Sequence, residues 1–175
     1  VTSVLIEKNT YMLTLLTHQP KPAQFKNHSY QRSYTIKYPE ADVWKWLNNP
    51  KTFTDNQVWP YRVVFTRTEN QVHDFEEGVF NSHHGPFMSF TGVIGEVQPS
   101  YRDLKYLYGS YFLSFRWIRP QRLQFWTQKE ADGHTTLTMQ LDSYVKPSFY
   151  NFWNWGQGLF WGSFGRWANK SIAKL

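Results

Sequence analysis

Cysteine is absent from this sequence of 175 residues, which excludes disulfides, thiolate metal sites and cysteine nucleophiles. Clusters of lysine and arginine are also missing, although the formal net charge is +6 and the sequence pI is near 9.5. A nucleic-acid interface needs basic side chains gathered on one surface, and here they are scattered. We therefore expect no nucleic-acid partner.

The sequence also lacks a long apolar run. Its first segment, VTSVLIEKNTYMLTLLT, carries Glu7 and Lys8 where the apolar region of a signal peptide would lie. The stretch FYNFWNWGQGLFWGSFG is uncharged, but it contains Asn, Gln and Ser and is shorter than the roughly 20 residues that span a bilayer. We expect a cytoplasmic protein, with contact of this stretch with a membrane surface, through Trp155 and Trp161, as an alternative.

Aromatic residues, by contrast, are abundant. They make up 19% of the chain, with nine Trp, eleven Tyr and fourteen Phe. A chain of this length suits one domain, whose core Leu, Ile and Val could fill. We infer that part of the aromatic set serves recognition rather than core packing.

The order of predicted elements is a strand, two short helices, six strands and a long helix. Residues 1–28 are interpreted as an N-terminal extension, with an apolar run at Tyr11–Leu16 and a proline-containing irregular stretch after it. From Ser29, SYQRSYTIKY alternates between apolar and polar residues as a half-buried strand does. PEADVWKWLNNP and PKTFTDN predict the short helices, and the segment from Trp59 to Val145 contains only strand patterns and turns.

The last segment, from Phe149 to the C-terminus, has no proline and sorts into two helical faces. At 100° per residue, one face is mainly aromatic and the opposite face holds Gly and Asn. The aromatic face contains Phe149, Trp153, Gly156, Phe160, Phe164 and Trp167, and the small face contains Asn151, Asn154, Gly158, Gly162, Gly165 and Asn169. We predict an uninterrupted helix whose aromatic face lies on the sheet.

Two motifs carry a family resemblance. YTIKYPEADVWKWLNNPKTF resembles the entry segment of the START-related, Bet v 1-like (SRPBCC, polyketide cyclase-like) superfamily, and GHTTLTMQLDSY with the aromatic helix resembles its closing hairpin and lid helix. The resemblance covers residues 29–175. It implies an α+β helix-grip fold, in which a curved antiparallel sheet of about seven strands wraps around a long C-terminal helix and encloses an apolar cavity. Superfamily members bind lipids, sterols or polyketides, and a minority act on them.

From these patterns we expect a ligand cavity with an aromatic wall. The expected ligand-binding residues are Tyr34, Phe90, Tyr108, Phe112, Phe125, Met139, Trp153, Gly156, Phe160 and Phe164, with His84 and Arg102 as polar groups at the rim. For Arg102 and the neighbouring Asp103, cross-strand pairing of charges on the wet face is the favoured interpretation, and contact with a polar headgroup is the other. The leading function is binding of a hydrophobic or amphipathic molecule, and the alternatives are a cyclase-like enzyme and a ligand-free structural subunit.

No catalytic set, metal site or cofactor is expected. His83 and His84 are adjacent in a predicted strand, so they point to opposite faces and do not serve one metal ion. GQGLFWG lacks the spacing of a dinucleotide-binding motif and has no strand before it.

The small face of the last helix predicts a contact. Gly158, Gly162 and Gly165 leave a flat surface that lets another segment approach closely. The expected occupants are the N-terminal extension, a second copy of the chain or another protein, and the alternative is a run of solvent-facing glycines.

Overall fold

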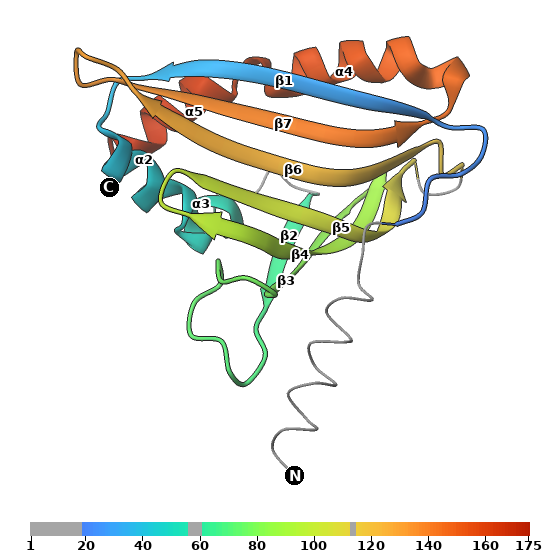
Figure 1. Cartoon of the computed structure of the whole chain (residues 1–175), viewed down its shortest axis with the longest axis horizontal. Helices are drawn as coiled ribbons and strands as arrows, with labels where there is room; N and C mark the ends of the chain where they lie inside the picture. Colours follow the sequence, from blue (N-terminus) through green and yellow to red (C-terminus); the bar gives the residue numbers. More distant parts are fainter. Residues whose placement is uncertain (1–18, 56–60, 113–114) are drawn as a thin grey trace.

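The computed structural model describes residues 19–55, 61–112 and 115–175, so the run Tyr11–Leu16 lies outside the described residues. Within these ranges seven strands form one antiparallel sheet in the order β1-β7-β6-β5-β4-β3-β2 (Figure 1). The strands are β1 (Lys26–Ile36), β2 (Arg62–Thr66), β3 (Phe80–Gly85), β4 (Met88–Gln98), β5 (Tyr101–Tyr111), β6 (Ile118–Lys129) and β7 (Thr135–Val145). The sequence-based expectation of an α+β helix-grip fold is confirmed.

Strand β1 lies at one edge of the sheet and contacts the C-terminal helices. Its alternating burial follows the predicted pattern, but it begins at Lys26, three residues before Ser29. His28 explains the earlier start, because this side chain is buried, its Nε2 lies 3.2 Å from Asn154 Oδ1, and its ring meets Tyr150 edge-on. The alternation therefore continues one inward position beyond the segment read from the sequence.

Two short helices close one end of the sheet. Helix α2 (Glu40–Leu47) starts after Pro39, and α3 (Pro50–Thr54) starts after Asn49, whose side chain accepts a hydrogen bond from the Lys51 backbone N–H. Trp46 of α2 is fully buried. Its ring packs against Trp167 at 4.9 Å between centroids, and its Nε1 donates to Ser171 Oγ. These contacts hold α2 against the C-terminal segment.

The C-terminal segment is not one uninterrupted helix. It contains a short 3-10 turn at Pro147–Phe149, then α4 (Tyr150–Gly162) and α5 (Phe164–Ile172). The break lies at Ser163, directly after Gly162, and Gly/Ser pairs are common sites of helix kinks. In Figure 1 α4 lies along β1 at the top of the view, and α5 is partly hidden by β1 and β7.

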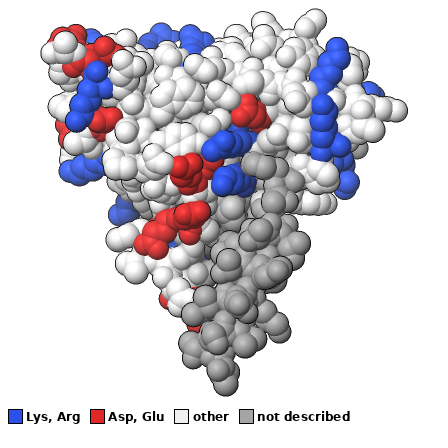
Figure 2. All heavy atoms as spheres, viewed as in Figure 1, with Lys and Arg blue, Asp and Glu red and all other residues white. Residues whose placement is uncertain are grey.

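Most of the face of the molecule shown in Figure 2 is uncharged; basic and acidic side chains are intermixed at the left and in the middle of the view, and basic side chains lie at the right. This distribution agrees with the scattered charges of the sequence. Among the described residues, no helix has the length and apolar character needed to cross a membrane.

Candidate functional site

A cavity of about 690 Å³ lies between the sheet and the C-terminal helices, within the size range of small-molecule sites. Strands β2–β6 and helices α3, α4 and α5 contribute to its wall. Most of the lining side chains are aromatic: Phe53, Tyr61, Phe65, Phe75, Phe87, Phe90, Tyr106, Tyr111, Phe112, Phe125, Phe152, Trp153, Phe160, Trp161, Phe164 and Trp167. The wall therefore offers a large apolar surface with few polar groups.

The rim of the cavity is also aromatic. Phe152 and Phe160 of α4 and Phe87 of the β3–β4 turn line the cavity and are exposed to solvent, Phe160 by 70%. At the other end of β5, Arg102 and Phe75 line the cavity but are buried. The cavity therefore opens between α4 and the β3–β4 turn and extends inward toward α2 and α3.

The structure brings most of the expected site residues to this cavity. The residues that line it are Phe90, Phe112, Phe125, Trp153, Gly156, Phe160, Phe164 and Arg102. Gly156 is notable because a Cβ built at this position would have no atom within 4 Å. The aromatic helix face therefore meets the cavity as the helical spacing predicts, and Gly156 leaves space within it.

Tyr108 and His84 do not line the cavity. A β-bulge at Leu107 changes the alternation of β5, so that Tyr106 is buried in the cavity wall while Tyr108 is 69% exposed. His84 is exposed, and its neighbour His83 lines the cavity. At His84 the adjacent residue takes the inward position, whereas at Tyr108 the bulge moves the next inward side chain of the cavity wall to Tyr111.

Tyr34 and Met139 are buried but also lie outside the cavity wall. Met139 is fully buried in the core beside Phe125, its partner across the strands. Tyr34 lies under the C-terminal helices, where its hydroxyl donates a 2.9 Å hydrogen bond to the Trp161 carbonyl. These two side chains hold the sheet and helices together.

Sequence reasoning missed several polar or ionisable lining groups, notably His83, Tyr106, Tyr111 and Gln157. Gln157 is buried, and its Oε1 accepts a 2.9 Å hydrogen bond from Trp161 Nε1. Its place four residues after Trp153 puts it on the same helix face, so helical spacing was a usable signal for it. Tyr106 continues the alternation of Arg102 and Leu104, so strand alternation was a usable signal for it, whereas Tyr111 follows the bulge and had no such signal.

Burial sets the protonation of these groups. It lowers the pKa of His83 to about 4, and the neighbouring His84 lowers it further in the same direction. Burial also raises the pKa of Tyr106 and Tyr111 above the usual range. Near neutral pH the cavity therefore presents a neutral imidazole and protonated phenols, and His83 Nε2 is buried without a hydrogen-bond partner in the described structure.

We expect His83 to make the protein less stable in mild acid. Between pH 6.5 and pH 4 the unfolded chain binds a proton at this position that the folded chain does not, so the free energy of unfolding falls as the pH falls through this window. Although its Nε2 is buried, His83 as a whole is of intermediate exposure, so we expect a loss of about 2 kcal/mol rather than the full value of the shift. Urea denaturation at pH 7 and pH 4.5 measures it. The His83→Phe variant should lose this part of the pH dependence, and an unchanged pH dependence would contradict the assignment.

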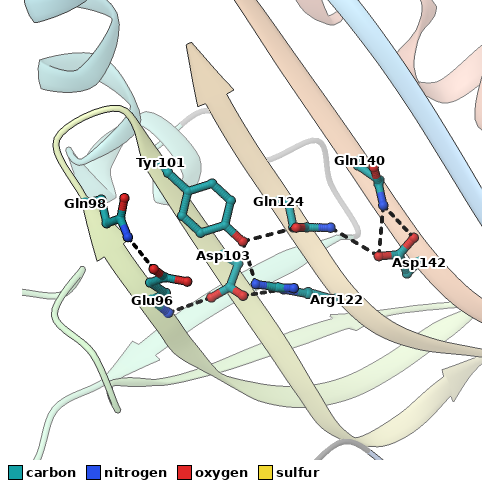
Figure 3. A network of polar contacts seen from close by, with 8 residues as sticks. All are labelled: Glu96, Gln98, Tyr101, Asp103, Arg122, Gln124, Gln140 and Asp142. Carbon is teal, nitrogen blue, oxygen red and sulfur yellow. Dashed lines mark hydrogen bonds and ion pairs between the residues drawn. The ribbon is translucent and has the colours of Figure 1, made fainter.

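The outer face of the sheet carries a polar network across β4–β7 (Figure 3). Asp103 is buried there, where it accepts a hydrogen bond from the Glu96 backbone N–H and pairs with Arg122. Arg122 also donates to the Tyr101 hydroxyl at 2.6 Å, and that hydroxyl donates to Gln124. The predicted cross-strand charge pairing is therefore found at Asp103, whereas the side chain of its neighbour Arg102 lines the cavity.

The small face of the C-terminal helices lies against β1 of the same chain. Arg32 Nη1 donates to the Gly158 carbonyl at 3.3 Å, and Asn169 Nδ2 donates to the Thr35 carbonyl at 3.1 Å. A Cβ at Gly165 would lie 2.7 Å from Tyr34 Cδ1. The expectation that Gly158, Gly162 and Gly165 contact the extension or another chain is therefore corrected: all three face β1, and the approach is close at Gly165 alone.

Alanine substitutions distinguish the two faces. Gly165→Ala should lower the free energy of unfolding by about 1–2 kcal/mol, because Tyr34 must move and weaken its bond to Trp161. Gly156→Ala should raise it by up to about 1 kcal/mol, because the new methyl group meets open space and alanine favours helix. Denaturation midpoints of the two variants test the assignment of faces. Equal shifts in the same direction would contradict it.

The described residues contain no group of three or more His, Cys, Asp or Glu side chains placed to hold a metal ion. Their cavity wall instead combines aromatic carbon with a cation, a neutral histidine and hydroxyl groups. The arrangement is suited to binding an organic molecule.

The comparisons with known proteins agree on the fold. No protein-family model matches the chain, and no curated protein matches it. Several solved structures do match. A structure of norcoclaurine synthase from Thalictrum flavum has a TM-score of 0.63 and 10% sequence identity, and the match covers 87% of this chain and 98% of that chain. The Zhui aromatase/cyclase from Streptomyces sp. R1128 has a TM-score of 0.65 and 9% identity, and the match covers 85% of this chain and 95% of that chain. The crystal structure of Ara h 8.0201 has a TM-score of 0.56 and 14% identity, and the match covers 86% of this chain and 100% of that chain. The chain therefore shares the helix-grip fold of these structures.

Proposed function

We propose that this protein binds a hydrophobic or amphipathic small molecule in the cavity between the sheet and α4–α5. The observation that carries the proposal is the cavity itself, about 690 Å³ with a mostly aromatic wall. A domain without a ligand gains stability by filling such space, and the chain instead has glycine at position 156, where a side chain would enter it. Among proteins of this fold, one norcoclaurine synthase structure is described as a complex with dopamine and hydroxybenzaldehyde, which supports a role for the fold in holding aromatic molecules.

Titration with phenylnaphthylamine, an uncharged probe that fluoresces in apolar surroundings, tests this proposal. We expect saturable binding of one probe molecule per chain. Native mass spectrometry of the protein purified from its source should then show one bound organic molecule that the probe displaces. Failure of the wild-type protein to bind the probe at a saturable site would overturn the proposal and favour a ligand-free structural role.

An enzyme related to the aromatase/cyclases is the second candidate function. It is favoured by His83, whose unpartnered Nε2 can accept a proton or hydrogen bond, next to Tyr106, whose ring lies 5.6 Å from the imidazole. Replacement of His83 by Phe separates the two functions. A binding protein keeps its ligand affinity and has no turnover to lose, whereas an enzyme loses turnover of the identified ligand.

A further inference from the structure

Arg102 is a buried cation in the wall of the apolar cavity. Its side chain lines the cavity, and the residue is only 1% exposed. Because successive side chains of a strand point to opposite faces, Asp103 lies on the outer face of the sheet and pairs there with Arg122. The carboxylate next in sequence therefore does not neutralise Arg102.

Among the described residues, the hydrogen-bond and ring partners of Arg102 are uncharged. Nη1 donates to the Leu47 carbonyl at 2.7 Å and to Asn48 Oδ1 at 2.9 Å, at the end of α2. The guanidinium carbon lies 4.0 Å from the centre of the Phe75 ring and 5.9 Å from that of Phe125. These contacts fix the side chain and supply favourable but incomplete compensation for its charge.

Two features show that this compensation is incomplete. Nε of Arg102 is buried and has no hydrogen-bond partner in the described part of the chain. The described residues that line the cavity include neither Asp nor Glu. Buried arginines are ordinarily paired with an anion, and this one has a free donor and lies where a ligand would bind.

The charge is retained near neutral pH. Burial lowers the pKa of Arg102 to about 9, and the smaller effect of Tyr106 acts in the opposite direction. The guanidinium is therefore still protonated at pH 7. The cavity presents one uncompensated positive charge at its buried end and an aromatic rim at the other.

We propose that the ligand is an organic acid with an apolar body, and that its anionic group binds Arg102. This inference rests on the proposed function, because it describes a ligand for the same cavity. The acidic group lies at the buried end beside Phe75, where it accepts a hydrogen bond from Nε, and the apolar body extends along the aromatic wall toward Phe87 and Phe160. Charge-assisted hydrogen bonds in a low-dielectric site give such a pairing both affinity and orientation.

A matched pair of fluorescent probes tests the acid. Anilinonaphthalene sulfonate and phenylnaphthylamine share their aromatic skeleton, and only the first carries an anionic group. Wild-type protein should bind the anionic probe at least about tenfold more tightly than the neutral one, because a hydrogen bond to a charged group is involved. Arg102→Met should remove this preference by weakening anionic-probe binding about 10- to 100-fold, with neutral-probe affinity changed by less than about twofold.

Arg166→Met is the control for surface binding of the anionic probe, because Arg166 is exposed on α5. We expect it to leave both affinities unchanged. Retention of the full anionic preference in Arg102→Met, or a wild-type protein that binds the neutral probe as tightly, would overturn the inference while leaving the proposed function standing. Failure of the wild-type protein to bind either probe would overturn the proposed function itself.

A measurement on the wild-type protein covers the case in which Arg102→Met does not fold. The NMR signal of the Arg102 Nε–H group should shift when the anionic probe is added and should move much less with the neutral probe. An unmoved Nε–H signal in protein saturated with the anionic probe would overturn the inference.

Discussion

Gly156→Phe should weaken phenylnaphthylamine binding about 100-fold, because its ring occupies the space in which the probe must lie. The position lines the cavity, and no atom lies within 4 Å of the Cβ that the substitution adds. Phenylalanine also has a higher helix propensity than glycine, so we expect the variant to be folded and at least as stable as the wild type. Fluorescence titration gives the affinity, and thermal unfolding checks the fold.

Leu159→Phe is the matched control for this variant. Leu159 lies on the same helix, is exposed, and does not line the cavity, so the same aromatic side chain placed there should leave probe affinity unchanged. If Gly156→Phe bound the probe as tightly as Leu159→Phe, the probe would not lie in the cavity.

Arg122→Met should destabilise the fold by about 3 kcal/mol, because it leaves a buried carboxylate without its counter-charge. Asp103 is fully buried, and its other protein contact in the network of Figure 3 is the Glu96 backbone N–H. Arg122 also positions the Tyr101 hydroxyl, so the substitution disturbs β4, β5 and β6 together. The difference in free energy of unfolding from urea denaturation measures the effect.

Lys129→Met provides the comparison for an exposed ion pair. Lys129 Nζ lies 3.4 Å from Glu40 Oε2, but the lysine side chain is largely exposed. Exposed ion pairs contribute less than about 1 kcal/mol to the free energy of unfolding. A loss of stability in Arg122→Met no greater than that in Lys129→Met would contradict the role given to Asp103.

The order of elements was predictable because alternation and capping are local properties. The alternating residues of β1, the proline before α2 and the Asp-Gly turn before β7 each act within a few residues of themselves. The break at Ser163 was predictable in principle from its Gly-Ser pair. It was missed because the clean separation of the two helix faces favoured a continuous helix.

The site was predictable only where strand alternation is regular or a helix face continues. Phe90, Phe125 and Trp153 line the cavity as expected, whereas the bulge at Leu107 reverses the inward and outward positions of β5 after Tyr106 and leaves Tyr108 outside. Bulges depend on pairing with a neighbouring strand, so a single strand does not reveal them. The packing of the small helix face on β1 is likewise a contact between segments far apart in the sequence. The helical spacing predicted that the glycines and asparagines share one face, but it did not indicate which segment packs against that face.

The charge of the cavity was also beyond local reasoning. Pairing on the wet face was the favoured interpretation of the Arg102 and Asp103 segment, and it is right for Asp103 alone. Which of two adjacent charges points inward depends on register with β4 and β6 and on the place of α2.

Methyl NMR tests the central claim, that a small molecule occupies this cavity, most directly. The chain contains three methionines, of which Met88 lines the cavity and Met139 is buried outside its wall. In protein labelled at the methionine methyl groups, phenylnaphthylamine at saturation should give intermolecular Overhauser contacts with the Met88 methyl group and none with that of Met139. A bound probe that makes no contact with Met88 would contradict the account.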